Sequence, residues 1–334
     1  LAVVMCVVVL VNVIVLASLK QTIAEEYAAS ISADMREQYI NAVNEALKNT
    51  DIVEDVTNAA TQKALEALNS SVGKVANTKS ASVARLYMYK DANVNPSTTS
   101  YNGIASGFLV TDSTDETPNR YLLTNAHCVR YEASKTQQSG YPFGVGRVTY
   151  EWASYGTIIC MFDGDTSNYY KLEVVAYGAY NGDHLDAESD DPDIALLRIV
   201  GKVSGSGTVS GQPSNEDHPS LKIALSDADR GSSVALIGNP EGVGTTNSIS
   251  VGTISQTGIT ISSWGSGTFV MTDAAVNGGN SGGPMINEDG FVVGIVESKL
   301  VDESIDNMGF ALSVSTIRDF VSSVSEKKNL NLSL

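Results

Sequence analysis

The sequence predicts an all-β domain that follows a helical amino-terminal segment. The first observation is an uninterrupted apolar run over residues 1–19, and the second is a proline-free stretch with helical periodicity over residues 20–79. The third is a change beyond residue 80, where short apolar runs are separated by Gly, Asn, Asp and Ser. Many short strands at close spacing are typical of a sandwich or a barrel.

Residues 1–19, LAVVMCVVVLVNVIVLASL, carry no charged side chain, and Lys20 opens the polar sequence that follows. At about 1.5 Å per residue, a helix over this run approaches the thickness of a bilayer core. A cleaved signal peptide, with an apolar region of roughly 7–15 residues and a small-residue cleavage site, is the alternative and fits less well. We therefore predict a single-pass anchor in the cell membrane, with the rest of the chain extracytoplasmic.

Apolar residues recur every four positions from Ile23 to Val43 and again from Ile52 to Val72. This spacing predicts helices, and Asp51 with Glu54 could cap the second one. Two interpretations stay open: a coiled-coil stalk that assembles a homo-oligomer, and a helix pair that packs on the chain's own domain. The stripe is rich in alanine and drifts from a strict heptad, so the pattern does not decide between them.

Beyond residue 80, a series of runs has the length and the β-branched or aromatic content of strands. These runs are SVARLYMY, ASGFLVT, RYLLTNA, GTIICMF, YKLEVVAYG, DIALLRIV, SVALIGN, SISVGTISQ, GTFVMTDA and GFVVGIVES. Residues 204–212 and a little beyond, SGSGTVSGQPS, read as a flexible connection between two groups of strands. A helix is expected over residues 315–324, with Ser315 as its cap and an apolar face formed by Ile317, Phe320, Val321 and Val324.

The charge balance excludes one class of partner. With 38 acidic and 21 basic residues, the chain has a formal net charge of −17. Nucleic-acid affinity comes mainly from clustered Lys and Arg. We therefore expect no nucleic-acid partner.

The cysteines leave one question open. Cys6 lies in the apolar run, and Cys128 and Cys160 lie in the part of the chain expected to be exported. These two could form a disulfide, but sequence spacing does not decide whether they do. No metal-site spacing is present, so neither a metal nor an organic cofactor is expected.

A serine, a histidine and an aspartate stand out as candidates for chemistry. Ser281 lies in the glycine-rich stretch NGGNSGGPM, which taken alone could be only a turn. His127 stands at the end of an apolar strand, and Asp193 immediately precedes another, so that its carboxylate could lie at the edge of a core. A buried carboxylate needs hydrogen-bond donors, and an imidazole N–H is a suitable one. His184 and His218 lie in acidic, turn-like segments and are expected at the surface.

Hydrolysis by serine needs a base, a group that orients the base, and N–H donors for the oxyanion. The glycines around Ser281 permit a tight loop in which the N–H groups of Gly279 and Ser281 point to one spot. A larger residue at Gly279 or Gly282 is expected to crowd the substrate backbone. The chain order His127, Asp193, Ser281 on an all-β background therefore suggests a serine hydrolase.

Further motifs follow in order between about Ser82 and Val324: GFLVT, TNAHCV, DIALLRI, IGNPEGVG, TDAAVNGGNSGGP, GIVES and NMGFAL. In these motifs the sequence resembles the trypsin-like serine peptidases, and within them the HtrA/Deg branch. The resemblance implies two six-stranded β-barrels with the active site in the cleft between them, and a carboxyl-terminal helix. It also implies His127 as general base and acid, Asp193 as its orienting group, Ser281 as nucleophile, and the N–H groups of Gly279 and Ser281 as the oxyanion hole.

The same resemblance implies a substrate pocket lined by Ala275, Ile295, Val296, Glu297, Ser298, Met308, Gly309 and Phe310. Ala275 stands where trypsin has the aspartate that binds basic side chains, so a buried Lys or Arg of the substrate would find no partner there. We expect cleavage after small or medium aliphatic residues. Glu297, expected near the pocket mouth, could in addition attract a basic side chain. Asp273 is expected to fix a loop by a hydrogen bond.

Two departures from the family pattern bear on regulation. Asn280 stands where trypsin zymogens have the aspartate that pairs with a newly freed amino terminus, so that activation step is not expected. HtrA enzymes usually carry PDZ domains after the peptidase, whereas this sequence stops soon after the predicted last helix. PDZ-mediated peptide sensing is therefore not expected either.

The predicted organisation is an anchor over 1–19, a helical stalk over 20–79, a peptidase domain over 80–325 and a polar tail over 326–334. The two barrels are expected at about 80–203 and 213–314. The predicted function is a membrane-anchored serine endopeptidase that acts on unfolded or exposed polypeptide, in HtrA-like quality control or regulated proteolysis. The alternative is a catalytically inactive, membrane-tethered binding or scaffold protein with a peptidase-like domain.

Overall fold

The computed structural model describes residues 72–95, 100–112, 119–138, 147–178, 192–205, 207–240, 246–261, 266–297 and 308–332. The predicted anchor over 1–19 and nearly all of the predicted stalk lie outside these residues. Within the described part of the chain, no helix combines the length and the apolar character needed to cross a membrane. The chain divides into the units Leu1–Val75 and Ala76–Leu334, and all strands lie in the second unit.

The first barrel is built from six antiparallel strands in the order β3-β2-β1-β6-β7-β8. It closes because β3 pairs with β8 as well as with β2. The short strand β9 (Gly207–Val209) extends the sheet beyond β8. The barrel strands are β1 (Val83–Tyr89), β2 (Gly103–Leu109), β3 (Tyr121–Thr124), β6 (Thr157–Phe162), β7 (Tyr170–Tyr177) and β8 (Ala195–Ser204).

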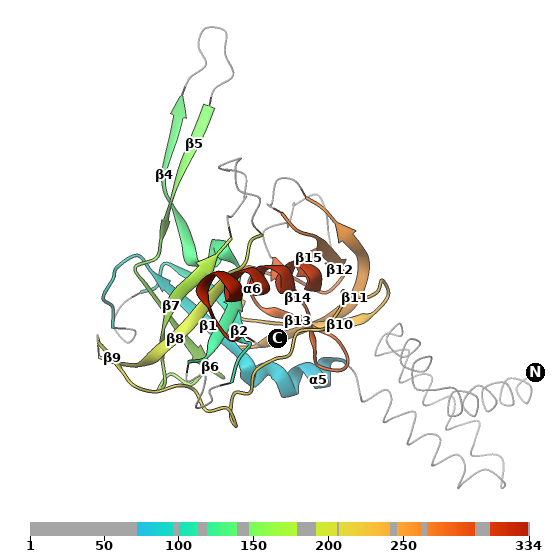
Figure 1. Cartoon of the computed structure of the whole chain (residues 1–334), viewed down its shortest axis with the longest axis horizontal. Helices are drawn as coiled ribbons and strands as arrows, with labels where there is room; N and C mark the ends of the chain where they lie inside the picture. Colours follow the sequence, from blue (N-terminus) through green and yellow to red (C-terminus); the bar gives the residue numbers. More distant parts are fainter. Residues whose placement is uncertain are drawn as a thin grey trace, which may run out of the picture. The chain divides into compact units, whose positions relative to one another are not determined.

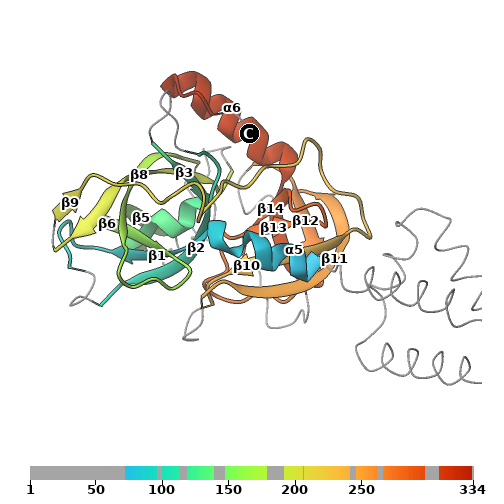
Figure 2. The same cartoon turned by 90° about the horizontal axis from the view of Figure 1, so that it is seen from below.

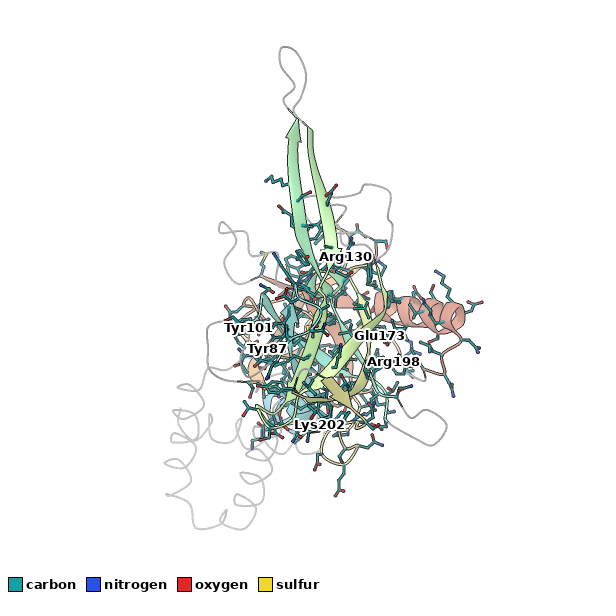
Figure 3. All side chains as sticks on the ribbon, turned by 90° about the vertical axis from the view of Figure 1, so that its left-hand side faces the viewer. Tyr87, Tyr101, Arg130, Glu173, Arg198 and Lys202 are labelled. Carbon is teal, nitrogen blue, oxygen red and sulfur yellow. The ribbon has the colours of Figure 1, made fainter. Side chains whose placement is uncertain are left out.

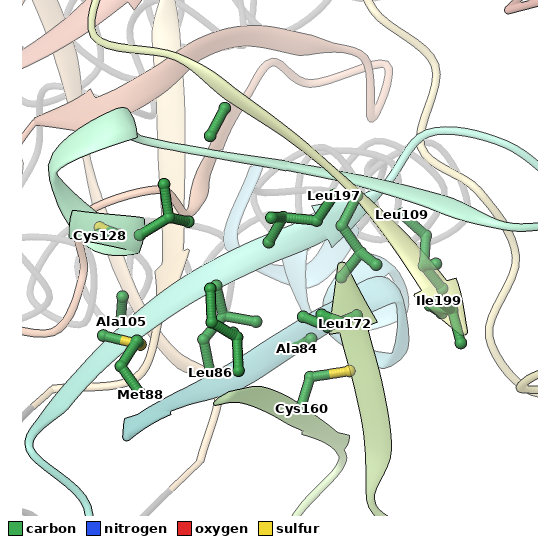
Figure 4. Close-up of a cluster of buried hydrophobic side chains, with 14 of the residues drawn as sticks. Ala84, Leu86, Met88, Ala105, Leu109, Cys128, Cys160, Leu172, Leu197 and Ile199 are labelled. Atoms are coloured by element: carbon green, nitrogen blue, oxygen red, sulfur yellow. The ribbon is translucent and has the colours of Figure 1, made fainter. Parts of the chain in front are cut away.

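Inward-facing side chains of these strands fill the first barrel (Figure 4). Leu86, Leu109 and Leu197 are fully buried and come from three different strands. Cys128 and Cys160 belong to the same apolar cluster, and both are free thiols. Burial raises the pKa of Cys160, which keeps this thiol protonated. The disulfide that the sequence left open is therefore not formed in this structure.

Charged and aromatic side chains both lie on the outside of this part of the chain, among them Glu173, Arg198 and the exposed Tyr101 (Figure 3). Glu173 on β7 and Arg198 on β8 are cross-strand partners and form an exposed ion pair. Exposed ion pairs contribute little to stability because water screens them. Glu173 and Arg198 therefore mark the side of β7 and β8 that faces water.

The second barrel also has six strands, closed in the order β10-β11-β12-β15-β14-β13. Figure 2 shows the two barrels side by side. This arrangement confirms the two-barrel fold that the family resemblance implied. The strands are β10 (Ser233–Gly238), β11 (Ser248–Ile259), β12 (Phe269–Thr272), β13 (Pro284–Ile286), β14 (Val292–Glu297) and β15 (Gly309–Ser313).

A long hairpin stands out from the first barrel (Figure 1). Its strands β4 (Arg130–Gln138) and β5 (Arg147–Ser154) pair with each other in a sheet of their own. We did not predict this hairpin, because RYEASKTQQ, the sequence of β4, has almost no apolar content. β4 begins directly after the short helical turn η2 (Ala126–Val129), which contains His127.

The connection between the barrels is more ordered than predicted. Within residues 204–212, β9 folds back on β8, with Gly205 at φ +62 in the turn between them. The fully buried Arg120 then holds the chain that follows, through hydrogen bonds from its guanidinium to the carbonyl oxygens of Pro213, Ser214 and His218. The ring of His218 packs on the ring of Phe162, with 4.8 Å between the two ring centroids. This histidine is therefore not free at the surface as predicted.

The carboxyl-terminal helix α6 spans Val314–Lys328 and packs on β14 and β15. Its cap is Ser313, whose hydroxyl accepts from the N–H of Thr316, and not Ser315 as predicted. The helix also continues into the predicted tail and ends at Asn329, which has φ +52. Its last turn is polar, so apolar periodicity alone ended the predicted helix too early. The short helix α5 (Val72–Lys79) precedes the first barrel in sequence.

Candidate active site

Ser281 lies in a tight double turn between β12 and β13. The N–H of Asn280 donates to the carbonyl of Asn277 at 3.0 Å, and Gly279 at the third position of that turn has φ +92. The N–H of Gly283 closes the next turn on the carbonyl of Asn280 at 2.9 Å. Positive φ at the third position is the signature of a type II turn and favours glycine. Ser281 is largely buried at the end of the first turn.

Strand β14 holds this loop from one side. The N–H of Gly282 donates to the carbonyl of Val296 at 3.0 Å, and the N–H of Val296 donates to the carbonyl of Gly283 at 2.9 Å. These two bonds continue the pairing of β13 with β14 into the loop. The backbone around Ser281 is thus an extension of the second barrel's sheet.

Ser106 on β2 holds the same loop from the first barrel. Its N–H donates to the carbonyl of Ser281 at 2.9 Å, and its hydroxyl donates to the carbonyl of Gly279 at 2.8 Å. The hydroxyl also accepts from the N–H of Asn239 at 2.8 Å. Ser106 is fully buried, and sequence reasoning missed it. The available signal was a small polar residue inside the apolar strand ASGFLVT.

Contacts with the first barrel require glycine at position 282. Gly282 has φ +81, and a Cβ there would lie 2.0 Å from the Thr124 hydroxyl oxygen and 2.3 Å from the Ser106 carbonyl oxygen. A side chain would therefore collide with the first barrel. At Gly279, the positive φ itself gives the reason for glycine.

His127 and Asp193 meet because β3 and β8 are antiparallel neighbours. Thr124 at the end of β3 lies opposite Ala195 at the start of β8, so the residues just outside this pair face each other. The Nδ1 of His127 is 2.6 Å from the Oδ2 of Asp193, and the backbone N–H of His127 donates to Oδ1 at 2.8 Å. The amide of Asn125 donates to the carbonyl of Asp193 at 3.0 Å. Backbone and side chain together fix this pair.

The residue after His127 touches the serine loop. The thiol of Cys128 lies 3.9 Å from the carbonyl oxygen of Ser281 and forms a weak hydrogen bond with it. The structure thus brings His127 and Asp193 into direct contact, and it places the residue after His127 against the backbone of the Ser281 loop. The Ser281 carbonyl receives both this contact and the N–H of Ser106.

Glu297 lies in a different place from the predicted pocket mouth. Only 4% of the residue is exposed, and its Oε2 is 3.6 Å from the Nδ1 of His127. One carboxyl oxygen of Glu297 lies within 4.8 Å of a carboxyl oxygen of Asp193, and hydrogen bonding between the two groups is one of the causes that lower the pKa of Asp193. The Glu297 side chain is therefore buried against the imidazole of His127. It is the last residue of β14, and the strand directs it toward the imidazole and its partner carboxylate.

The protonation of the pair follows from these contacts. Burial alone would raise the pKa of Asp193, but the positive charge of His127 and the hydrogen bonds from His127 and Glu297 lower it. Burial alone would lower the pKa of His127, yet the acidic neighbours Cys128, Glu297 and Asp193, with the Asp193 hydrogen bond, raise it well above its usual value.

His127, Asp193 and Glu297 also form a cluster in which metal-ligating atoms lie within 4.8 Å of one another. The 2.6 Å between His127 Nδ1 and Asp193 Oδ2 is a hydrogen-bond distance. Two atoms that each lie about 2 Å from a tetrahedral metal ion stand more than 3 Å apart. The three side chains as arranged therefore form a hydrogen-bonded group, and an ion would have to separate them.

Part of the predicted pocket borders open space. Ala275 lines a cavity of about 590 Å³, together with Pro240, Ser248, Ile249, Ser250, Asn277, Gly278 and Asn280. Gly309 lies beside this segment, because a Cβ there would be 2.5 Å from a methyl of Val276. Met308 is 41% exposed, and Phe310 pairs with Glu297 across β15 and β14.

Two of the predicted pocket residues lie in the core instead. Ile295 and Val296 are fully buried in β14, whose two faces are covered by the barrel interior and by α6. Only the backbone of Val296 reaches the serine loop. Ser298 lies outside the described residues. Asp273 does fix a loop, because it accepts from the N–H and the hydroxyl of Thr253.

Comparison with known proteins places this geometry in a family. The family model described as a trypsin-like peptidase domain matches residues 105–295. The serine protease Do-like HtrA of Bacillus subtilis is 34% identical over 107 residues, covering 30% of this chain and 24% of its own length. The serine protease Do-like HtrB of the same organism is 35% identical over 151 residues, covering 42% of this chain and 30% of its own length.

A solved structure shows the same fold. The HtrA-type protease AlgW, in a serine-to-alanine variant with a tripeptide, matches with a TM-score of 0.50 and 21% identity. The match covers 75% of this chain and 63% of that one. The chain spans about a quarter to a third of the length of the two Bacillus relatives.

Proposed function

Because the chain belongs to the family of trypsin-like peptidase domains, we propose that it is an HtrA-like serine endopeptidase that hydrolyses peptide bonds through an acyl-enzyme. The observation that carries this proposal is the 2.6 Å hydrogen bond between His127 Nδ1 and Asp193 Oδ2, formed beside the anchored loop of Ser281. A base, its orienting carboxylate and a serine hydroxyl are the parts that serine hydrolysis requires.

In the proposed reaction, the Ser281 hydroxyl oxygen attacks the carbonyl carbon of the scissile peptide. His127 accepts the hydroxyl proton at Nε2, because Nδ1 is held by Asp193. The imidazolium then gives this proton to the leaving amine, and a water molecule hydrolyses the ester. The N–H groups of Gly279 and Ser281 are the proposed donors to the oxyanion, on a turn that Ser106 anchors at the Gly279 carbonyl.

The proposed substrates are unfolded or exposed polypeptide segments with a small or medium aliphatic residue before the cleaved bond. Ala275 at the cavity offers no charge to a basic side chain. The buried position of Glu297 against His127 removes the one acidic side chain that was expected to attract such a residue. The proposed preference for small or medium aliphatic residues therefore rests on the small, uncharged side chain of Ala275 in the lining of this cavity.

We further propose that the peptidase domain is extracytoplasmic and held at the cell membrane. Its support is the uncharged composition of residues 1–19 and the polar sequence that follows. A stalk over residues 20–79, which would assemble the chain into an oligomer, is likewise a prediction from periodicity. Fractionation of cells before and after carbonate extraction would test the membrane attachment.

Replacement of the nucleophile tests the proposed chemistry. Ser281→Ala is expected to reduce casein hydrolysis by at least about three orders of magnitude, because no other hydroxyl takes its place in the loop. A fluorophosphonate probe is expected to label the wild-type chain, with no labelling of Ser281→Ala and strongly reduced labelling of His127→Ala. Circular dichroism of each variant provides the folding control.

Two results would contradict the proposal. Full hydrolysis by Ser281→Ala would show that Ser281 is not the nucleophile. A folded wild-type chain that neither hydrolyses casein nor reacts with the probe would favour the inactive binding or scaffold protein.

A further inference from the structure

Glu297 adds a second buried carboxyl to the His127–Asp193 pair. The exposed fractions of the two acidic side chains are 4% for Glu297 and 3% for Asp193, and that of His127 is 11%. Oε2 of Glu297 lies 3.6 Å from His127 Nδ1, against 2.6 Å for Asp193 Oδ2. Glu297 is thus too far to replace Asp193 as the hydrogen-bond partner of the imidazole, but close enough to change its charge state.

Two buried carboxyl groups whose oxygens lie within 4.8 Å of each other can form a hydrogen bond only if they share a proton. An ionised carboxylate can only accept hydrogen bonds, so one of the two groups must carry an O–H. Asp193 already accepts from Nδ1 of His127 at one oxygen and from the His127 backbone N–H at the other. Those two donors favour the ionised form of Asp193, and the proton therefore belongs on Glu297.

The alternative places that proton on the imidazole. With Glu297 and Asp193 both ionised, two negative charges would be buried beside His127 and would hold it in the positive form. A positively charged imidazole cannot accept the proton of Ser281. A proton on Glu297 removes one of the two negative charges, which limits the rise in the pKa of His127.

We propose that Glu297 is a positioning residue whose protonated carboxyl donates a hydrogen bond to the Asp193 carboxylate. With one negative charge fewer beside it, His127 becomes neutral at a lower pH than it would next to two carboxylates, and can then accept the proton of Ser281. This inference rests on the proposed peptidase function. It assigns the role to the O–H of Glu297 and not to a negative charge.

The backbone of β14 beside Glu297 also holds the loop that contains Ser281. Val296, the preceding residue, exchanges two backbone hydrogen bonds with the serine loop at Gly282 and Gly283. Adjacent residues of β14 therefore hold Ser281 through the backbone and Asp193 through a side chain. Because Asp193 belongs to the first barrel and Ser281 to the second, the carboxyl–carboxyl bond aligns the two halves of the site.

Two substitutions in the full chain distinguish a hydrogen-bond donor at position 297 from a negative charge at that position. Glu297→Gln replaces the O–H by an amide N–H, which can still donate to Asp193. Its kcat/KM is expected to stay within about threefold of wild type, with the acid limb of the pH profile unmoved. Glu297→Leu fills similar space without a donor, and its kcat is expected to fall by about 10- to 100-fold with little change in KM.

Cys128 and Tyr155 are the other titratable groups around His127, and both are present in every variant. A change in the pH profile can therefore be assigned to position 297. Glu173→Gln, which removes an exposed carboxyl on β7, is the matched control and is expected to leave kcat and the pH profile unchanged.

A spectroscopic measurement does not depend on activity. The infrared difference spectrum of wild type minus Glu297→Gln at pH 7 is expected to contain the C=O band of a protonated carboxyl. A carboxylate band instead, or an acid limb that moves by about one pH unit in Glu297→Gln, would overturn the inference in favour of an ionised Glu297. Wild-type activity in Glu297→Leu would overturn it in favour of a space-filling role.

These outcomes stay separate from those of the proposed function. If the wild-type chain is inactive, the peptidase proposal fails, and the infrared band still reports where the proton lies. If Glu297→Leu does not fold, the comparison of wild type with Glu297→Gln decides the question.

Discussion

The position of a single proton governs the chemistry available to His127. Nδ1 donates to Asp193 at 2.6 Å, which leaves Nε2 as the basic nitrogen. The lowered pKa of Asp193 keeps its carboxylate ionised, and that negative charge favours the positive imidazole formed after proton transfer. The same negative charge raises the pKa of His127 before proton transfer. The imidazole is therefore a stronger base, but a higher pH is needed to make it neutral.

The pH dependence of hydrolysis follows from this shift. The protonated imidazole cannot accept the serine proton, so kcat/KM should fall as the pH decreases through the pKa of His127. Because that pKa is raised, the acid limb is expected above the ordinary histidine value of about 6.5. Initial rates on a peptide substrate between pH 5 and pH 10 at constant ionic strength would measure it, and a limb at or below 6.5 would contradict the shift.

At the scale of elements, the serine loop is held between a strand of each barrel. β14 contributes backbone hydrogen bonds at Gly282 and Gly283, and β2 contributes both polar groups of Ser106. The carbonyl of Gly279 is therefore fixed by the first barrel, although the loop belongs to the second. Through this contact, the turn that carries the proposed oxyanion donors depends on both barrels.

Gly282→Ala tests how closely the loop fits the first barrel. The new Cβ would lie 2.0 Å from the Thr124 hydroxyl oxygen at a residue with φ +81, so the substitution combines a collision with backbone strain. We expect a loss of about 3 kcal/mol or more in the free energy of unfolding, and loss of fluorophosphonate labelling. Urea unfolding followed by fluorescence would measure the first effect.

Gly258→Ala is the matched control for this substitution. Gly258 lies in β11 with φ +66, but no atom stands within 4 Å of a Cβ placed there. The control therefore carries the backbone strain alone, and a loss of about 1–2 kcal/mol is expected. Equal losses in the two variants would show that contact with β2 and β3 does not restrict the loop.

At the scale of the whole molecule, one buried cation organises the chain between the barrels. Arg120 has no exposed surface and donates to three carbonyl groups in the segment 213–218, which leads toward the second barrel. Its backbone N–H also donates to the side chain of Gln212 at 3.3 Å. The connection that the sequence suggested to be flexible is therefore tied to the first barrel.

Arg120→Met is expected to lower the free energy of unfolding by about 3 kcal/mol or more. The substitution leaves several carbonyl groups without their donor in a buried place, and each such group costs about 1–3 kcal/mol. Arg198→Met, which breaks an exposed ion pair on the same barrel, is expected to cost less than about 1 kcal/mol. Denaturant unfolding of both variants provides the comparison, and similar losses would show that the buried hydrogen bonds of Arg120 add nothing.

The sequence by itself determined the features that depend on local pattern. Short apolar runs with β-branched or aromatic residues marked most barrel strands, because this composition favours extended backbone whatever the neighbouring strands are. The order and setting of His127, Asp193 and Ser281 identified the candidate site, because each residue stands beside a strand end or in a glycine turn with its own local signature. Family motifs then supplied the two-barrel arrangement.

Only the tertiary structure decided the features that depend on contacts between distant segments. Ser106 reads as a small residue in an apolar strand, and its role appears only when β2 lies against the serine loop. Glu297 reads as a pocket residue until the end of β14 places it beside His127 and Asp193. The β4–β5 hairpin was missed because β4, RYEASKTQQ, is almost entirely polar, and its pairing with β5 appears only in the folded chain. Hydrogen bonds between residues far apart in sequence leave no periodicity in either segment, and for this reason they could be found only in the folded chain.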